Sequence, residues 1–236
     1  MKELFKRQQF HPGLLGLFIN PFYLARRELK KHIAFFAPRL HGALLDIGCG
    51  SKPYAELFSH TAQYTGMEFA SEKRKGESVA DAYYDGTRFP FPDRAFDSAL
   101  ATEVLEHVFN PDEFLEETRR VLKPEGVLLL TCPFIWNEHE QPYDYGRYSS
   151  FGLKHLLEKH GFEIVEHHRT GSGMRAIFQL VNCYIYAKLP AGHYWMRLPL
   201  YILLCFPVTL LGLLFSALLP KSEELYLGNA VLARKL

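Results

Sequence analysis

The sequence predicts an α/β fold in which a doubly wound, mainly parallel sheet is covered by helices on both faces. Strand-like and helix-like segments alternate along most of the 236 residues, which favours parallel strands joined by helices. Residues 44–47 form a short apolar run that contains an acid and leads into two closely spaced glycines. Residues 64–68 form a second short strand that ends in another acid. In this class of sheet, ligands bind outside the carboxyl ends of the strands.

The loop after the first strand is suited to a cofactor. Gly48 and Gly50 lack a Cβ atom, so they adopt backbone angles denied to other residues and let a ligand approach the main chain. Asp46 lies where the strand opens into a ligand crevice. The third glycine of a dinucleotide loop is absent, because Pro53 or Tyr54 stands in that region. The pattern indicates a nucleotide-type cofactor loop, with an incidental strand and turn as the alternative.

Further acids follow the next strands. Glu68 lies about 20 residues beyond the loop, the spacing at which a carboxylate accepts hydrogen bonds from ribose hydroxyls. Asp85 precedes the apolar and proline-containing run 89–92, and residues 96–102 read as another buried strand. Glu103 comes directly after that strand.

The flanking segments complete the alternation of strands and helices. The expected elements are a helix from Asn20 to Ala37, a helix that closes over residues 120–126, a strand over 127–131, a helix capped by Ser149 that reaches His160, and a sixth strand over 162–168. Gly161 is a natural stop for the helix that precedes the sixth strand. Arg26, Arg27, Lys30 and Lys31 give the first helix a basic face, which suits either a solvated surface or an anionic membrane.

Four segments together resemble a known family. LLDIGCGSKPY, YTGMEF, DGTRFPFPDRAFDSALATEVLEHV and RRVLKPEGVLLLTCPF are similar in order and spacing to class I S-adenosylmethionine-dependent methyltransferases of the small-molecule, type 11-like branch. The resemblance covers roughly residues 40–170, and it departs at Glu125, where the family usually has a glycine in a surface turn. It implies a Rossmann-like sheet of seven strands, with the last strand antiparallel and inserted beside the sixth.

The resemblance also implies a site for S-adenosylmethionine over the carboxyl ends of the strands. The implied cofactor-binding residues are Asp46, Gly48 and Gly50 for the methionine part, Glu68 for the ribose, Asp85 or its rival Asp81 for the adenine amino group, and Glu103 to close the pocket. Each acid could instead cap a helix. Four acids at successive strand ends favour the binding interpretation.

The acceptor is expected near the polar and aromatic segment 136–148, which follows the fifth strand. His139 is the first candidate for a catalytic base, because an unperturbed histidine titrates near neutral pH. His139 could equally be a surface residue of the loop. His107 is a weaker candidate, for which helix capping or packing is the favoured alternative. Asp144 and Arg147 are expected to fix the loop as an ion pair and, with Tyr143, to form the substrate-binding side.

The C-terminal third contains an uncharged run, residues 198–219, that is long enough to cross a bilayer, although Pro199 and Pro207 should kink it. Residues 225–233 read as a strand, and pairing with the sixth strand would put both ends of the insertion on one side of a membrane. We therefore expect residues 173–189 and 198–219 to form a helical hairpin that dips into one leaflet. A soluble lid or dimer interface and a true crossing are the alternatives. Lys188, Arg197 and Lys221 suit interfacial positions.

Composition agrees with an intracellular globular enzyme. The expected hairpin adds a location at the inner face of the cytoplasmic membrane, peripheral or monotopic. A net charge of +1 argues against a nucleic-acid partner, and residues 1–20 lack a signal cleavage site. The four cysteines, Cys49, Cys132, Cys183 and Cys205, have no metal-ligand spacing, so reduced thiols and no metal are expected.

The expected parts are an N-terminal helical segment 1–40, a methyltransferase core 41–172, a hydrophobic hairpin 173–224 and a final strand 225–236. The family resemblance implies methyl transfer, and with the expected hairpin it suggests a small-molecule or lipid-linked acceptor. A soluble lidded enzyme and a non-catalytic binding module are the alternatives. The sequence identifies neither the acceptor nor the oligomeric state.

Overall fold

The structure is a computed structural model that describes residues 2–70, 79–190, 192 and 194–236. The chain divides into two compact units. A helical unit comprises residues 1–32, 135–137 and 169–228, and a sheet unit comprises residues 33–134, 138–168 and 229–236. Each unit is described by itself.

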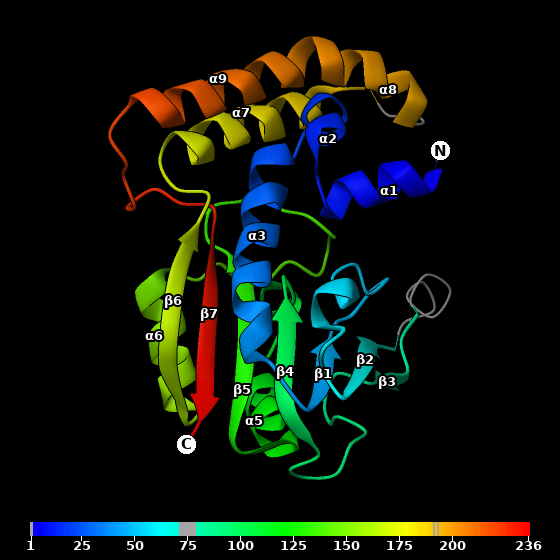
Figure 1. The fold of residues 1–236 in the computed structure, drawn as a ribbon, viewed down its shortest axis with the longest axis vertical. Coiled ribbons are helices and arrows are strands. Elements are labelled where there is room, and N and C mark those ends of the chain that lie inside the picture. Colours follow the sequence, from blue (N-terminus) through cyan, green and yellow to red (C-terminus); the bar gives the residue numbers. More distant parts are fainter. Residues whose placement is uncertain (1, 71–78, 191, 193) are drawn as a thin grey trace. The chain divides into compact units, whose positions relative to one another are not determined.

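One sheet of seven strands runs in the order β3-β2-β1-β4-β5-β7-β6 (Figure 1). The strands are β1 (Ala43–Ile47), β2 (Gln63–Phe69), β3 (Ala82–Tyr84), β4 (Phe96–Thr102), β5 (Leu122–Pro133), β6 (Phe162–Thr170) and β7 (Gly228–Lys235). The first five pair in parallel, and β7 runs in the opposite direction between β5 and β6. This confirms the predicted fold class, including the antiparallel last strand beside the sixth.

The register brings the carboxyl ends of the central strands to one edge of the sheet. Ile47 on β1 lies beside Met67 on β2, and Glu68 lies beside Tyr83 on β3. On the other side of β1, Ile47 lies beside Ala101 near the end of β4. The loops that follow these strands therefore meet along one edge.

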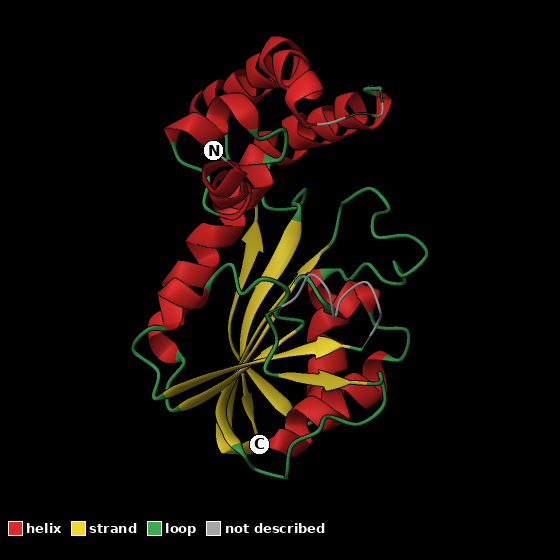
Figure 2. Cartoon of the chain, turned by 90° about the vertical axis from the view of Figure 1, so that its right-hand side faces the viewer, coloured by secondary structure: helices red, strands yellow, loops and turns green. Residues whose placement is uncertain are grey.

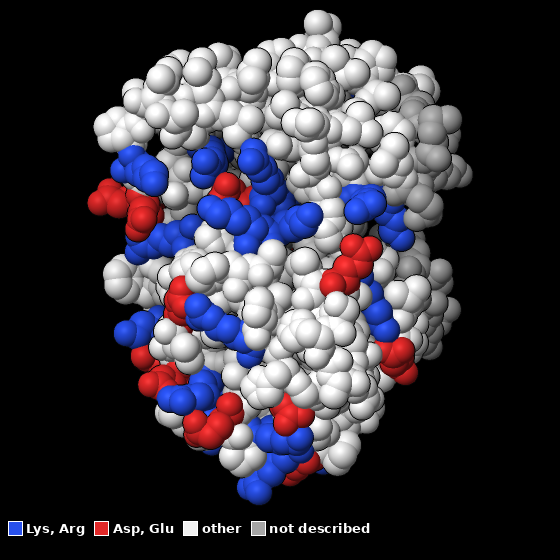
Figure 3. Space-filling view, in the orientation of Figure 1, with Lys and Arg blue, Asp and Glu red and all other residues white. Residues whose placement is uncertain are grey.

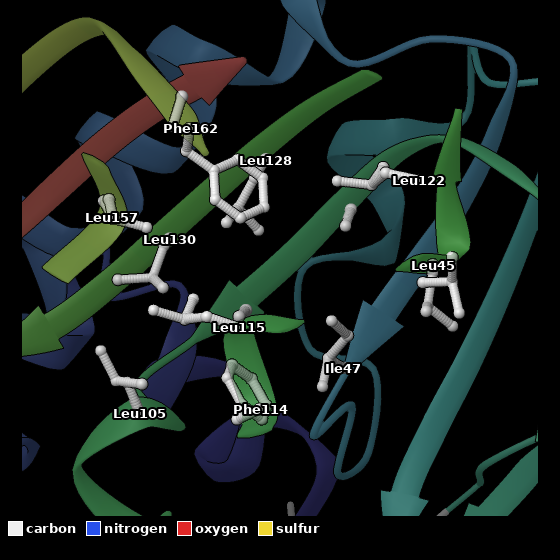
Figure 4. Close-up of a cluster of buried hydrophobic side chains, with 14 of the residues drawn as sticks. Leu45, Ile47, Leu105, Phe114, Leu115, Leu122, Leu128, Leu130, Leu157 and Phe162 are labelled. Atoms are coloured by element: carbon white, nitrogen blue, oxygen red, sulfur yellow. The ribbon is translucent and has the colours of Figure 1, made fainter. Parts of the chain in front are cut away.

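Helices of the sheet unit pack against its strands (Figure 2). The helical elements of the sheet unit are η1 (Ala37–Arg39), η2 (Ala55–Phe58), η3 (Leu105–His107), α5 (Pro111–Val121) and α6 (Ser150–Lys159). Apolar side chains from α5, α6 and the strands form one buried cluster (Figure 4). Leu128 and Leu130 in this cluster are fully buried, and so is Leu129 between them, as expected for a strand that is buried on both faces.

The termini of α6 form as predicted. The Ser149 hydroxyl accepts a hydrogen bond from the Gly152 N–H at 3.2 Å, which caps the first turn. Gly161 ends the helix with a φ of 72°, a left-handed conformation that favours glycine.

One boundary was predicted wrongly. Residues 122–126, expected to close a helix, already belong to β5, because Leu122 pairs with Phe96 before the register shifts at Ser98. Glu125 lies in this irregularity with a φ of 62°. The left-handed backbone accounts for the glycine that the resembling family usually has at that position.

The helical unit contains α1 (Lys2–Phe10), α2 (Leu14–Ile19), most of α3 (Tyr23–Phe36), α7 (Met174–Lys188), α8 (Tyr194–Leu200) and α9 (Phe206–Leu218). A π-helical turn, η4 (Tyr201–Cys205), joins α8 to α9. Pro199 lies inside α8, and Pro207 lies in the first turn of α9, where its missing N–H is tolerated. The irregularity predicted from the two prolines thus takes the form of a π-helical turn between them.

The helices α7 and α9 pack directly on each other. Asn182 donates a hydrogen bond to the Thr209 hydroxyl at 2.8 Å, and both side chains are buried. A Cβ atom at Gly212 would lie 2.8 Å from the Cβ of Phe178, so the close approach depends on this glycine. At the base of the pair, the Leu227 N–H donates to the Thr170 carbonyl at 2.9 Å, which ties the two ends of the insertion together.

Candidate active site

The glycine loop after β1 is held by β2. The Gly48 N–H donates to the Met67 carbonyl at 2.8 Å, and the Gly50 N–H donates to the Glu68 carboxylate at 2.9 Å. Both glycines have positive φ, 69° and 50°. A Cβ atom at Gly48 would lie 2.5 Å from a methyl group of Val104, whereas the Cβ position of Gly50 has open space around it. The loop therefore needs glycine at one position for packing and leaves the main chain accessible at the other.

Asp46 is a buried carboxylate beneath this loop. Its Oδ2 accepts a hydrogen bond from the Tyr64 hydroxyl. Burial raises the pKa of Asp46 to about 7, the Tyr64 hydrogen bond opposes the rise, and the charge of Glu68 adds to it. The side chain consequently titrates near neutral pH.

Glu68 is fixed at the end of β2. The side chain is 3% exposed, and its second oxygen accepts from the Phe69 N–H at 3.0 Å. Backbone donors thus hold the carboxylate in one orientation.

The two rivals for the adenine position differ in their surroundings. Asp85 directly follows β3 and accepts hydrogen bonds from the Thr87 N–H and hydroxyl, which lower its pKa. Asp81 precedes β3 and accepts from the Gly66 N–H at 2.7 Å and from Lys52 Nζ at 2.6 Å. Asp81 is therefore engaged in an ion pair, and Asp85 stands at the carboxyl end of its strand.

Glu103 follows β4 in an unusual conformation. Its φ is 54°, and its N–H donates to the carbonyl and hydroxyl oxygens of Thr131 at 3.0 and 3.1 Å. A non-glycine residue in this region is uncommon and marks a position that the surrounding hydrogen bonds enforce.

A second group of side chains gathers beyond β4 and β5. The carbonyl of Glu106 in η3 accepts from the N–H groups of Tyr145 and Gly146 at 2.7 and 3.2 Å, which fastens the loop after β5 to η3. Nδ1 of His107 lies 2.5 Å from the Tyr143 carbonyl. The Tyr143 ring itself is exposed, so its carbonyl rather than its ring enters the group.

His139 is positioned by Asp144. The Asp144 Oδ2 accepts from the His139 N–H at 2.9 Å and lies 3.2 Å from its Nδ1. Arg147 pairs with the same carboxylate, 2.7 Å from Nη2 to Oδ2, which confirms the predicted ion pair. Burial alone would raise the pKa of Asp144, but hydrogen bonds from Arg147 and the His139 backbone lower it to about 2. Burial and the neighbouring His107 lower the pKa of His139.

Glu106 completes this group, although it was not among the site residues predicted from the sequence. Its side chain is fully buried, and neither carboxylate oxygen has a hydrogen-bond partner among the residues that the structure describes. Its Oε1 lies 3.8 Å from Nε2 of His107 and 4.0 Å from Nε2 of His139. Burial and the charge of Glu103 raise its pKa well above the ordinary range.

Lys52 and Tyr64 are further polar residues of the site that the sequence analysis missed. Lys52 stands two residues after Gly50, so its position in the sequence could have identified it as a cation of the glycine loop. Tyr64 reaches Asp46 only because β1 and β2 are neighbours, which no local pattern shows.

A glycine loop after β1, an acid at the end of β2 and an antiparallel β7 together define the class I methyltransferase architecture. A model of the methyltransferase domain family matches residues 23–167, and the chain belongs to this family of S-adenosylmethionine-dependent methyltransferases.

Curated relatives agree with this assignment. The chain is 31% identical over 115 residues to a ubiquinone/menaquinone biosynthesis C-methyltransferase of Cupriavidus metallidurans, covering 43% of this chain and 47% of the relative. It is 34% identical over 98 residues to a fatty-acid O-methyltransferase of Mycolicibacterium smegmatis, covering 37% of this chain and 36% of the relative. The chain thus spans about half the length, or less, of these relatives.

Solved structures share the fold. The [4+2]-cyclase SpnF is similar at a TM-score of 0.56 and 21% identity, covering 88% of this chain and 80% of that one. Phosphoethanolamine N-methyltransferase 2 of Haemonchus contortus, solved in complex with S-adenosyl-L-methionine, is similar at a TM-score of 0.55 and 17% identity, covering 97% of this chain and 58% of that one.

Proposed function

We propose that this chain transfers a methyl group from S-adenosylmethionine to a small-molecule or lipid-linked acceptor at the cytoplasmic surface of a membrane. The observation that carries the proposal is the row of acids at successive strand ends around the glycine loop. The names of the relatives support the acceptor class, since one acts in quinone biosynthesis and another on fatty acids.

The donor-side residues fit this cofactor. Gly50 presents open space where a side chain would otherwise stand, and Glu68 is buried with its carboxylate already oriented. In the proposal, Asp46 and the two glycines hold the methionine part, Glu68 the ribose and Asp85 the adenine amino group. Asp81 is the weaker choice because Lys52 already pairs with it. Glu103 closes the pocket from the β4 side.

The acceptor side is assigned to the loop after β5. S-adenosylmethionine supplies a methyl group on a sulfonium, so the protein has mainly to align the acceptor in a dry pocket. His139, held by the Asp144 carboxylate that pairs with Arg147, is the proposed base for an acceptor hydroxyl, with His107 as the second candidate. Tyr143 is the proposed contact at the solvent-exposed rim.

The proposed domain organisation treats residues 173–224 as an inserted hairpin between an N-terminal segment 1–40, a core 41–172 and a final strand 225–236. The hydrogen bond between Leu227 and Thr170 supports this, because it joins the chain entering the insertion to the chain leaving it. Within the insertion, residues 191 and 193 lie outside those that the structure describes.

Membrane association is supported by the surface of the helical unit. Among the described residues, one helix, Met196–Leu218, is long and apolar enough to cross a membrane, with a mean hydropathy of 2.3, and 22% of its most apolar window is buried. Exposed leucines include Leu203 at 69% and Leu218 at 68%. Figure 3 shows a broad face of this unit without Lys, Arg, Asp or Glu. An apolar patch of this kind marks a membrane or protein interaction site.

The test is flotation of the purified chain with lipid vesicles. The double variant Leu203→Glu/Leu214→Glu is expected to bind at least about tenfold more weakly, because two exposed leucines would no longer enter lipid. Binding of the parent should survive high salt, since apolar burial is not screened. Phe151→Glu, on an exposed position of α6, is the matched control and should bind like the parent.

Parent protein that stays soluble beside vesicles yet turns over a small substrate would favour the lidded soluble enzyme. Donor binding without turnover of any acceptor would favour a non-catalytic binding module.

A further inference from the structure

Three possible ligand atoms for a metal ion converge beside the proposed acceptor position. They belong to Glu106, His107 and His139, and all lie within 4.8 Å of one another. The first two residues come from η3 and the third from the loop after β5, so the convergence depends on the fold.

The hydrogen bonds of the two histidines define which ring nitrogen faces the others. Nδ1 of His107 points to the Tyr143 carbonyl at 2.5 Å, and Nδ1 of His139 points to the Asp144 carboxylate at 3.2 Å. Both acceptors are oxygens without a proton, so Nδ1 carries the hydrogen in each ring. Each Nε2 then presents a lone pair toward Oε1 of Glu106. Rings held by an oxygen on one nitrogen, with the other nitrogen free to ligate, are the usual arrangement of metal-binding histidines.

The state of the Glu106 side chain supports a cation site independently of the histidine geometry. Its carboxylate is fully buried, and both oxygens lack a hydrogen-bond partner within the described part of the chain. A buried carboxylate left in this state is costly unless a cation or donor compensates it. The two Nε2 lone pairs that face Glu106 cannot donate a hydrogen bond to it, whereas a cation at their meeting point would be ligated by all three groups.

The distances allow such a cation after a small adjustment. Nitrogen and oxygen ligands lie at roughly 2.0–2.2 Å from a transition metal, so two ligands of one ion lie no more than about 4.4 Å apart. The Nε2 atoms of His107 and His139 are 3.8 and 4.0 Å from Oε1 of Glu106. Side-chain shifts of under roughly 1 Å would bring these atoms to bonding distance from one centre.

We infer that Glu106, His107 and His139 bind one divalent first-row transition-metal cation, such as Mn²⁺ or Zn²⁺. Two imidazoles and one carboxylate suit these ions better than Mg²⁺ or Ca²⁺, which prefer oxygen ligands. Three protein ligands leave open positions for an acceptor oxygen, and a bound cation lowers the pKa of a hydroxyl that it ligates. This role rests on the proposed function, and it makes His139 a ligand rather than the direct base.

The experiment uses the full-length chain, free of affinity tag and dialysed against chelator. Mn²⁺, Zn²⁺ and Mg²⁺ are each titrated by calorimetry, and free Mn²⁺ is also counted by electron paramagnetic resonance. We expect one Mn²⁺ or Zn²⁺ per chain, bound more tightly than Mg²⁺. Glu106→Gln and His139→Ala should each weaken binding at least about a hundredfold, and Asp144→Asn, which loses the charge that orients His139, by about ten- to a hundredfold.

The controls are His155→Ala and Glu113→Gln, exposed residues of the same types, which should bind metal like the parent. Thermal melting and S-adenosylmethionine titration confirm that each variant is folded. Parent-like metal binding in folded Glu106→Gln and His139→Ala would overturn the inference, as would tighter binding of Mg²⁺ or no binding at all. Donor binding without metal binding would sink this inference alone, and metal binding without donor binding would sink the proposed function while leaving the cation site.

Discussion

The two sides of the sheet unit hold their buried carboxylates in opposite ways. On the proposed donor side, Glu68 accepts hydrogen bonds from two backbone N–H groups, and Asp46 accepts one from Tyr64. On the proposed acceptor side, Glu106 is equally buried, but its side-chain oxygens find no hydrogen-bond partner among the described residues. Hydrogen bonds within the protein therefore already hold the carboxylates of the proposed donor side, whereas the Glu106 carboxylate on the proposed acceptor side is not held in this way.

The largest expected effect is a loss of turnover when the proposed acceptor side is altered and the proposed donor side is left intact. Once an acceptor is found, His139→Ala should lower kcat by about a hundredfold or more and leave donor affinity nearly intact, whether His139 acts as base or as ligand. Steady-state kinetics and donor calorimetry on the same preparation measure both quantities. A fully active His139→Ala beside an inactive His107→Ala would show that the roles of the histidines are misassigned.

Glu68→Ala should change the affinity for the donor without changing the affinity for the metal. Glu68→Ala removes a charge-assisted contact worth roughly 1.5–3 kcal/mol, so binding of S-adenosylmethionine should weaken about ten- to a hundredfold. Metal affinity should be unchanged in this variant, because Glu68 lies at the end of β2 and not in η3. An equal loss of affinity for S-adenosylmethionine and for the metal would mean that the donor and acceptor sides are not independent.

The pH dependence of donor affinity tests Asp46. With a pKa of about 7, Asp46 is protonated in the donor-free protein below neutral pH. A cationic donor favours the carboxylate, so binding must release this proton, and affinity should fall by up to about tenfold per pH unit below 7 and level off above it. Tyr64→Phe removes a hydrogen bond that lowers the pKa and should move the midpoint to higher pH. A flat profile between pH 6 and 8 would contradict the assignment.

The smallest expected effect is on stability, with no change in the affinity for donor or metal. Ser149→Ala removes the cap of α6 and should lower the free energy of unfolding by about 1 kcal/mol. Denaturant unfolding measures the loss, and affinities for donor and metal should stay at parent values. Altered affinity for either ligand would show that the capped helix is coupled to the site.

The sequence was informative where the signals are local. The strand, acid and glycine order around Asp46 and Gly48 predicts the loop, and the run near the C-terminus predicts a strand. The family resemblance, rather than this run alone, implied that the last strand returns to the sheet. Residues 122–126 were assigned to the preceding helix because their composition does not show the pairing of Leu122 with Phe96.

The cluster around Glu106 could not be predicted in the same way. It requires Nδ1 of His107 to meet the carbonyl of Tyr143, 36 positions further along the chain, and the loop after β5 to turn back on η3. Such contacts depend on tertiary folding and leave no periodic pattern. The cysteine spacing gave no metal signal because the proposed ligands are histidine and glutamate.

Calorimetric titration of the purified full-length chain with S-adenosylmethionine at pH 8 tests the central claim most directly, because it needs no knowledge of the acceptor. The account predicts one donor molecule bound per chain, with binding weakened about ten- to a hundredfold in Glu68→Ala. The absence of donor binding to folded parent protein would contradict it.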